Sequence, residues 1–397
     1  MGDCTPCRRT PSDADRAHHD NFALRDSAVT PFNAKRMGPH RDLIGDLGAA
    51  VRKAGLRFGV SNHGVENFTF VNPTDTLDAR LRTQHADLYD ATWAGFYNVA
   101  DRSPQAMARF LSDWLARNFE LIDKYQPDLL YFDNGVNLRV LDPLNERVAA
   151  YYYNRAADWG KDVSIVTKWV AYAPDNDDRH QIGAVIGFEK VGTRSPSGIR
   201  PGPWMVDDTI GSTWGYTDRM TIGSAGAILG KLIDTVSKGG FYLLNIALNA
   251  GGTIPDDQRA VLLEIGAWLK RNGEAIYGTH AWTRFGDGDW RFTVKDGALY
   301  AIGRPSEYSH CCRHLFSLTA ATRSHQSPPP ILTYRRHPVL IHRRQSFSSV
   351  TATRAREISR IFQMSKMLSS MANGRVRPGT DSQMPPLASF PIFIVQM

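Results

Sequence analysis

The sequence predicts an α/β fold with a parallel sheet, closer to a barrel than to an open sheet. Three stretches of the 397-residue chain each combine an amphipathic helix, a short loop and an apolar strand, the pattern of parallel α/β units. The predicted strands are apolar at almost every position, as expected when both faces of a sheet are covered. Polar residues follow directly where several of these strands end, as they do at the active-site end of a barrel.

The first unit begins with a helix over about 43–53, followed by Gly55 and the strand-like stretch LRFGVS, residues 56–61. The second has a helix over about 110–125, which Pro127 ends before the strand LLYF, residues 129–132. The third has a helix that stops at Gly160 and a strand VSIVTK, residues 163–168.

A barrel and an open doubly wound sheet both fit these units. None of the strands is followed by a G-x-G-x-x-G or G-x-x-x-x-G-K-[ST] motif, and this weakens the case for a nucleotide-binding open sheet. His63, Asp133 and Lys168 all follow or end predicted strands. In a barrel, side chains at those positions line the active site.

The chain changes character after the predicted barrel. A helix extends over 262–272, and the alternating stretch 290–304 around Asp296-Gly297 predicts a hairpin. From Pro305 onward the 93 residues contain 14 Ser, 9 Pro and 11 Arg with no sustained period, which predicts disorder or a mis-framed second domain. We therefore expect a disordered start at 1–16, a barrel domain at 17–280, the beginning of a sandwich at 281–304 and a basic tail at 305–397.

The net charge of +7 does not indicate a nucleic-acid-binding protein, because the charge is confined to the tail. Residues 305–397 carry 12 Lys and Arg against 3 Asp and Glu, so the rest of the chain has a net charge of −2. A tail-driven polyanion binder remains a separate hypothesis. The chain has no long apolar run and no visible signal peptide, so we expect neither membrane nor nucleic-acid partners. The four cysteines lack the spacing of a zinc site.

Two acids at the ends of apolar runs, Asp133 and Glu189, are the first candidates for chemistry. Each has an ordinary alternative: Asp133 can cap a helix or form a salt bridge, and Glu189 can be a solvated loop residue beside Lys190. Taken together, they suggest paired-carboxylate chemistry such as glycoside hydrolysis. Asp207 and Asp208 are the rival acids.

Aromatic and histidine residues provide further candidates for binding. Trp204 and Trp214 suggest platforms for the apolar faces of sugars, with core packing as the ordinary alternative. The other candidates are polar side chains near predicted strands, with loop polarity as their alternative: His18, His19, His63 and Glu66.

Long phrases of this chain resemble the family 29 glycoside hydrolases, the α-L-fucosidases. The resemblance extends from AHHDNFAL to about Arg304 and includes GLRFGVSNHGVENF, DKYQPDLLYFDNG and PWMVDDTIGSTWGY. It implies a (β/α)8-like barrel followed by a β-sandwich. It also implies retaining hydrolysis of α-linked L-fucose without metal or cofactor, and a secreted, periplasmic or lysosomal location. The family's first strand, with an H-W-G-like segment, has no counterpart here, so we expect a barrel that lacks its first β/α unit and an exposed sheet edge.

The resemblance also implies roles for individual residues. Asp133 matches the nucleophile of the family's W-F-D strand end, with Tyr131 in place of the tryptophan. Glu189 matches the acid/base of one subgroup and should lie about 5–5.5 Å from Asp133. Substrate-binding roles are implied for the remaining candidates: His18, His19, His63, Glu66, Tyr131 and Trp204. A truncated homologue that binds fucosylated glycans without turnover is the alternative.

Overall fold

A computed structural model of the chain describes residues 21–67, 75–97, 103–172, 183–303, 315–318 and 392–396. His18, His19 and the predicted disordered start lie outside these residues. Of the predicted tail, the structure describes two strands, β10 (Leu315–Leu318) and β11 (Ile392–Gln396). No helix in the described part of the chain is long and apolar enough to span a membrane.

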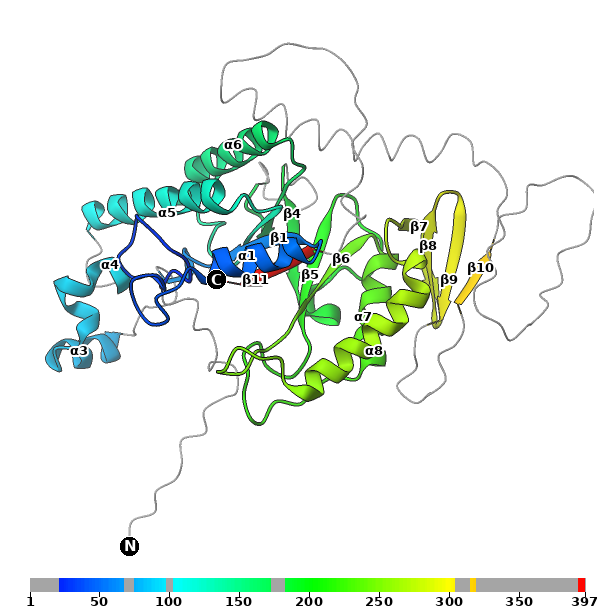
Figure 1. The fold of residues 1–397 in the computed structure, drawn as a ribbon. Coiled ribbons are helices and arrows are strands. Elements are labelled where there is room, and N and C mark those ends of the chain that lie inside the picture. Colours follow the sequence, from blue (N-terminus) through cyan, green and yellow to red (C-terminus); the bar gives the residue numbers. More distant parts are fainter. Residues whose placement is uncertain are drawn as a thin grey trace, which may run out of the picture.

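Seven parallel strands form a curled sheet, which Figure 1 shows as the centre of the molecule. Their order is β11-β1-β2-β3-β4-β5-β6, and among the described residues the two ends of this sheet do not pair with each other. The strands after β11 follow chain order: β1 (Arg57–Asn62), β2 (Leu129–Phe132), β3 (Ser164–Lys168), β4 (Val185–Glu189), β5 (Trp204–Thr209) and β6 (Gly240–Asn245). The predicted parallel α/β fold is confirmed, as a partial barrel.

The helices between the strands end where the sequence predicted, but the two expected over about 110–125 and 262–272 begin about six residues earlier than expected. α1 (Leu43–Lys53) is capped by the Asp42 side chain and is followed by Gly55, whose φ is +74°. α5 (Pro104–Tyr125) ends at Gln126, which is left-handed, just before Pro127. α6 (Asp142–Trp159) ends at the left-handed Gly160. The remaining longer helices are α3 (Asp75–Thr83), α7 (Ala225–Ser237) and α8 (Asp256–Asn272), with the short α4 (Ala94–Tyr97).

The expected open edge beside β1 carries a strand from the other end of the chain. β11 pairs with β1 in parallel, with Arg57 opposite Ile392 and Ser61 opposite Gln396. Because an unpaired edge leaves backbone donors and acceptors without partners, this strand completes the hydrogen bonding of β1.

A second, antiparallel sheet follows the barrel strands. Its order is β10-β9-β8-β7, with β7 (His280–Asp287), β8 (Trp290–Lys295) and β9 (Ala298–Gly303). The predicted hairpin at Asp296-Gly297 joins β8 to β9, and both turn residues have positive φ. Arg291 of β8 binds Asp234 of α7 at 2.6 Å, so an ion pair ties this sheet to the barrel helices.

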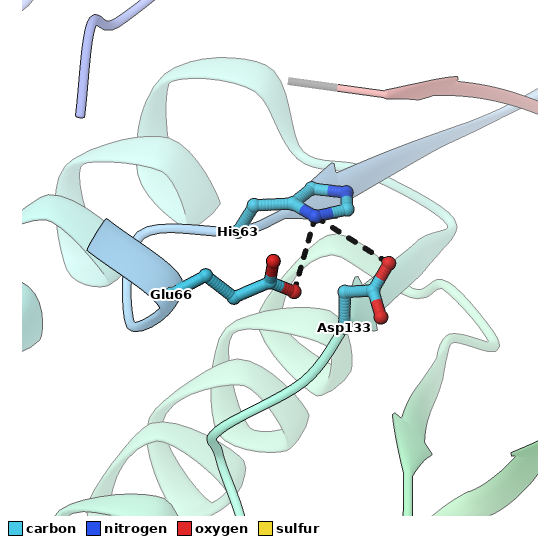
Figure 2. A group of neighbouring side chains, drawn as sticks. All are labelled: His63, Glu66 and Asp133. Atoms are coloured by element: carbon cyan, nitrogen blue, oxygen red, sulfur yellow. Dashed lines mark ion pairs between the residues drawn. The ribbon is translucent and has the colours of Figure 1, made fainter. Parts of the chain in front are cut away.

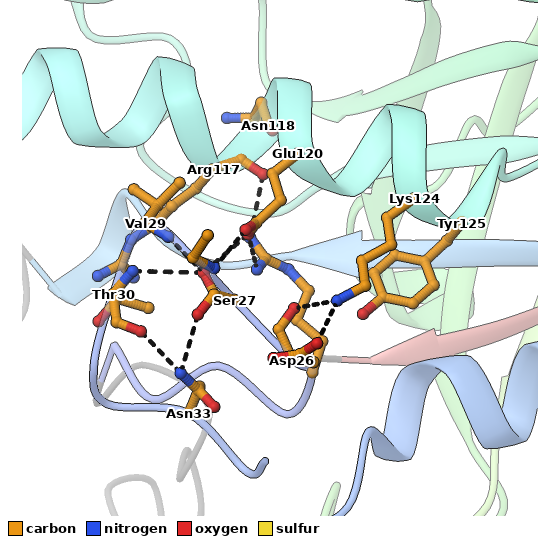
Figure 3. Close-up of polar contacts among 12 residues, drawn as sticks. Asp26, Ser27, Val29, Thr30, Asn33, Arg117, Asn118, Glu120, Lys124 and Tyr125 are labelled. Carbon is orange, nitrogen blue, oxygen red and sulfur yellow. Dashed lines mark hydrogen bonds and ion pairs between the residues drawn. The ribbon is translucent and has the colours of Figure 1, made fainter. Parts of the chain in front are cut away.

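The segment before α1 is fixed against α5 by a buried polar network (Figure 3). Glu120 accepts from Arg25 at 2.6 Å, from the Ser27 hydroxyl at 2.7 Å and from the Ala28 amide at 2.6 Å. The side chains of Arg25 and Glu120 are only 4% and 16% exposed. Lys124 adds a more exposed pair with Asp26.

We expect Glu120→Ala to lower the free energy of unfolding by about 3–5 kcal/mol, because it leaves the buried Arg25 guanidinium without its partner. Denaturant unfolding followed by circular dichroism measures this. The matched control is Arg284→Ala, which breaks a pair whose side chains are 62% and 69% exposed. Its cost should stay below about 1 kcal/mol. Equal effects of the two substitutions would contradict a supporting role for the Glu120 network.

Candidate active site

The inner face of the curled sheet carries apolar side chains that give way to charged ones at the carboxyl ends of the strands. Leu129, Tyr131, Val166, Val185 and Met205 form one cluster on this face. Because side chains alternate along a strand, the residue two positions further on points to the same side. The charged inner-face residues are therefore Asp133 after β2, Lys168 on β3, Glu189 on β4 and Asp207 on β5.

Asp133, the acid that follows the buried strand β2, is paired with His63, which follows β1. His63 Nδ1 lies 3.4 Å from Oδ2 of Asp133 and 3.3 Å from Oε1 of Glu66, as Figure 2 shows. Glu66 is fully buried and also accepts from the backbone amide of Asn134 at 2.8 Å. The imidazole therefore contacts the Asp133 carboxylate directly, and Glu66 holds the backbone of the next residue.

Lys168 joins three of the inner-face acids. Its Nζ lies 2.9 Å from Oδ1 of Asp133, 3.3 Å from Oδ2 of Asp207 and 3.4 Å from Oε2 of Glu189. The Lys168 side chain is 6% exposed, whereas Glu189 is 29% exposed and lies nearest to solvent. The nearest oxygens of Asp133 and Glu189 are thus no farther apart than the sum of their two distances to Nζ, about 6.3 Å.

Burial and charge act against each other in this cluster. Burial alone would lower the pKa of Lys168, but the charges of Asp207, Asp133 and Glu189 raise it above its ordinary value. Burial raises the pKa of Asp207 to about 6, although the Lys168 ammonium opposes that shift. Burial, and then the nearby Asp207 and Asp133 charges, raise the pKa of Tyr131. The Tyr131 hydroxyl therefore stays protonated at neutral pH.

His63, Glu66 and Asp133 also offer one imidazole nitrogen and two carboxylate oxygens within 4.8 Å of one another. Such donors suit a divalent cation. Here the same atoms pair with each other, and the Lys168 ammonium supplies a positive charge to Asp133. We therefore assign no metal to this group.

A cavity opens on the α5 side of His63. Asn62, His63 and Gly64 line it together with four residues of the segment before α1 and one side of α5. The four are Asn21, Phe22, Ala23 and Arg25. One of its walls is thus the segment that directly follows His18 and His19. Asp133, Lys168 and Glu189 do not line it, so this cavity and the carboxylate cluster meet only at His63.

Strand alternation overturns the predicted placement of Trp204 in the site. Trp204 is 1% exposed and clusters with Ile186 and Val206 on the outer face of the sheet. Its ring packs edge to face against Phe188 and directly over the Cα of Gly240, where a Cβ would lie 2.4 Å from the indole. No ring face is left for a sugar. The same alternation turns Asp208 outward, where it pairs with Lys231 at 2.8 Å.

Trp214, the other predicted platform, does lie beside the cluster. Its ring centroid is 5.9 Å from Lys168 Nζ and 5.7 Å from Lys190 Nζ. Of the predicted site residues within the described part of the chain, His63, Glu66, Tyr131, Asp133 and Glu189 gather at this end of the sheet. Trp204 does not.

Two residues of the site were given no individual role by the sequence. Lys168 was expected to line the active site as a strand-end residue, but no partner was predicted for it, although its position two residues after Val166 places it on the inner face. Trp169 follows it with a φ of +62°, is 45% exposed, and donates from Nε1 to Oδ1 of Asn134 at 2.7 Å. A bulky residue in the left-handed region is uncommon and often marks a functional site.

Comparison with known proteins identifies the family of this chain. The family profile described as alpha-L-fucosidase matches residues 15–274. Tissue alpha-L-fucosidases from Rattus norvegicus and Homo sapiens are 31% and 29% identical, each match covering 72% of this chain and 56% of the relative. The crystal structure of Thermotoga maritima alpha-fucosidase in complex with fucose aligns with a TM-score of 0.53 at 30% identity, covering 72% of this chain and 59% of that one.

A second solved structure, alpha-L-fucosidase isoenzyme 1 from Paenibacillus thiaminolyticus, aligns with a TM-score of 0.54 at 26% identity, with 72% of this chain and 66% of that chain covered. The chain spans just over half the length of the curated relatives it matches. The family profile covers well over half of the chain itself. The chain therefore belongs to the α-L-fucosidase family.

Proposed function

We propose that this chain hydrolyses α-linked L-fucose by double displacement, with Asp133 as nucleophile and Glu189 as acid/base. The observation that carries the proposal is the shared Lys168 ammonium, which keeps the nearest oxygens of the two acids within about 6.3 Å. Retaining glycosidases hold their carboxyl groups about 5–5.5 Å apart, and inverting enzymes about 6.5–9.5 Å apart. The bound of about 6.3 Å lies below the inverting range, so the pair is compatible with the retaining class that the family resemblance implies.

The two acids differ in a way that suits these roles. Asp133 is 7% exposed and its carboxylate contacts His63 and Lys168. These contacts would hold the carboxylate in one orientation when a sugar binds. Glu189 is more exposed and lies at the rim, where a leaving group departs and water enters. In the first step Asp133 would attack the anomeric carbon while Glu189 protonates the departing oxygen. In the second step Glu189 would take a proton from water, which then releases fucose.

The substrate class is supported by the relatives. Thermotoga maritima alpha-fucosidase has been solved with fucose and with a mechanism-based inhibitor, and its chain shares the fold described here. We infer a fucosylated oligosaccharide or glycoconjugate as substrate, with His18, His19, His63, Glu66 and Tyr131 as the proposed fucose-binding residues. No cofactor is needed for this chemistry.

A second reading has its own observation. The sheet does not close among the described residues, and the chain spans only part of its relatives. A homologue with an incomplete pocket would bind fucosylated glycans without turnover. Calorimetric binding of a fucosylated oligosaccharide by a folded chain that releases no fucose would establish this alternative.

The first test of the proposal is Asp133→Gly. We expect fucose release from an aryl α-L-fucoside and from an α1,3/1,4-fucosylated oligosaccharide to fall by at least about 1000-fold. Added azide should restore turnover of the aryl fucoside and yield the fucosyl azide of inverted configuration, because azide then displaces the leaving group directly. Glu264→Gln, an exposed acid on α8, should keep the parent activity. Azide without effect on a folded variant would argue against Asp133 as nucleophile.

The acid/base role is tested by Glu189→Ala. Cleavage of the oligosaccharide should fall by about 100-fold or more, because its leaving group needs a proton. A nitrophenyl fucoside needs none, so its first step should persist as a burst and azide should speed the second step. Asp207→Asn is the matched comparison. If Asp207→Asn shows this leaving-group dependence and Glu189→Ala does not, the role passes to Asp207.

The raised pKa of Asp207 predicts a pH-dependent stability. The folded chain holds this proton up to about pH 6, whereas the ordinary value is 3.8. Between these values the folded state binds more protons than the unfolded state, so stability falls as the pH rises through this window, by roughly 3 kcal/mol at most. Asp207→Asn should lack that fall in denaturant titrations from pH 4 to 7, and Glu264→Gln should retain it. Parallel curves for Asp207→Asn and the parent would contradict the prediction.

A further inference from the structure

Lys168 Nζ lies within 3.4 Å of carboxylate oxygens from three different strands. An ammonium has three N–H groups. Its three partners are Asp133 after β2, Glu189 on β4 and Asp207 on β5, at 2.9, 3.4 and 3.3 Å from Nζ. The side chain is 6% exposed, so bulk water contributes little to its solvation. Such an arrangement fixes one positive charge at one point between the two proposed catalytic acids.

This charge has a defined electrostatic setting. Carboxylates that share a buried site cannot all be ionised without an opposite charge nearby. Lys168 provides that charge on the inner face, and the Lys190 ammonium lies 5.7 Å from the centroid of the Trp214 ring, which Lys168 also approaches. The titratable groups that face the Asp133–Lys168 pair come from every strand around it: His63 and Glu66 after β1, Tyr131 on β2, Glu189 on β4 and Asp207 on β5.

The proposed reaction moves one negative charge between two of these partners. In the first step the bond from the anomeric carbon to the leaving oxygen breaks, and an ester bond to Asp133 forms, so Asp133 loses its charge. The proton on the leaving oxygen comes from Glu189, which becomes a carboxylate. In the second step water gives its proton to Glu189 and its oxygen to the anomeric carbon, and the Asp133 carboxylate is restored. The total charge of the site is the same throughout.

We propose that Lys168 is the fixed counter-charge for this negative charge as it passes from Asp133 to Glu189 and back. The inference rests on the proposed roles of those two acids and adds a positioning residue to them. Nζ contacts both carboxylates in one geometry, so neither step requires the ammonium to move. Preorganised charges of this kind stabilise a developing charge without reorganisation.

Asp207 anchors the ammonium in this position. It is 1% exposed and lies opposite Glu189 in the pairing of β4 with β5. Its Oδ2 lies 3.3 Å from Lys168 Nζ. A lysine that contacts a single carboxylate can change rotamer along its flexible four-carbon side chain, whereas contacts with three carboxylates restrict the ammonium to one position. Arg is not equivalent here, because its planar fork spreads the charge over several nitrogens and cannot place one point charge at three oxygens.

The same sheet provides a matched control. On the outer face of β5, Lys231 pairs with Asp208 at 2.8 Å, its single acidic partner in the described part of the chain, and is 40% exposed. Lys231→Met removes a lysine–aspartate pair from the same strand without touching the inner face. We expect it to leave the rate and the pH profile of fucose release unchanged.

The test compares Lys168→Met, Lys168→Arg and Lys231→Met in the full chain. For Lys168→Met we expect the acid limb of kcat/KM for an aryl α-L-fucoside to move up by about one pH unit or more, because ionised Asp133 has lost its opposite charge. Single-turnover and burst kinetics should show both the first and the second step slowed, each by about 100-fold or more. Lys168→Arg should keep the acid limb in place and recover part of the rate.

A second readout does not need turnover. The carboxyl carbon of Asp133, assigned as the aspartate resonance missing from Asp133→Asn, is followed by NMR against pH. In Lys168→Met its titration should move to higher pH, and in Lys231→Met it should not. An unmoved titration, an unmoved acid limb, or a slowed first step with an unaffected second step would overturn the inference.

The outcomes separate this inference from the proposed function. A parent chain that releases no fucose, while Lys168→Met moves the Asp133 titration, overturns the proposed function and supports the charge pairing. If Lys168→Met does not fold, Lys168→Arg decides. If the acid limb of kcat/KM for Lys168→Arg stays at the parent position while the rate falls, the inference is supported. If that limb moves by a full pH unit, the inference is overturned.

Discussion

The site depends on one buried ammonium. Lys168 lies at the carboxyl end of β3, between strands that each end in or carry an acid, and its charge makes it tolerable to gather three carboxylates on one apolar face. Without that charge, the three carboxylates would have to bind protons or move apart. The spacing of Asp133 and Glu189, on which the proposed chemistry depends, is therefore set by their common contact with one nitrogen atom.

Strand alternation determines which side chains can take part. The inner face of the sheet has an apolar floor of Leu129, Val166, Val185 and Met205, and its charged residues all follow with the same parity. The outer face, packed against the helices, receives the residues in between. Two acids that are adjacent in the sequence therefore lie on opposite faces of the sheet. Asp207 contacts Lys168 in the site, and Asp208 pairs with Lys231 of α7.

The edges of the sheet and its surroundings hold the strands in register. β11 pairs with β1 on one side, and the Glu120 network fixes the segment before α1 against α5. On the far side, the Asp234–Arg291 pair joins the antiparallel sheet to α7. These contacts lie away from the acids, but they support the strands whose ends carry the site residues. The positions of those side chains therefore depend on the pairing of the whole sheet.

The sequence by itself predicted three helix–strand units, the parallel sheet and the hairpin at Asp296-Gly297, and it placed the candidate acids Asp133 and Glu189 at strand ends. Local patterns suffice for these, because helix periodicity, Gly and Pro stops and apolar runs act over a few residues. Only the tertiary structure decided that Lys168 is the partner of both acids, that Trp204 belongs to the core and that Asp207 rather than Asp208 faces the site. Those outcomes depend on pairing between strands that are distant in sequence. Asp207 of β5, for example, lies opposite Leu243 of β6, 36 residues later, and no local pattern specifies that register.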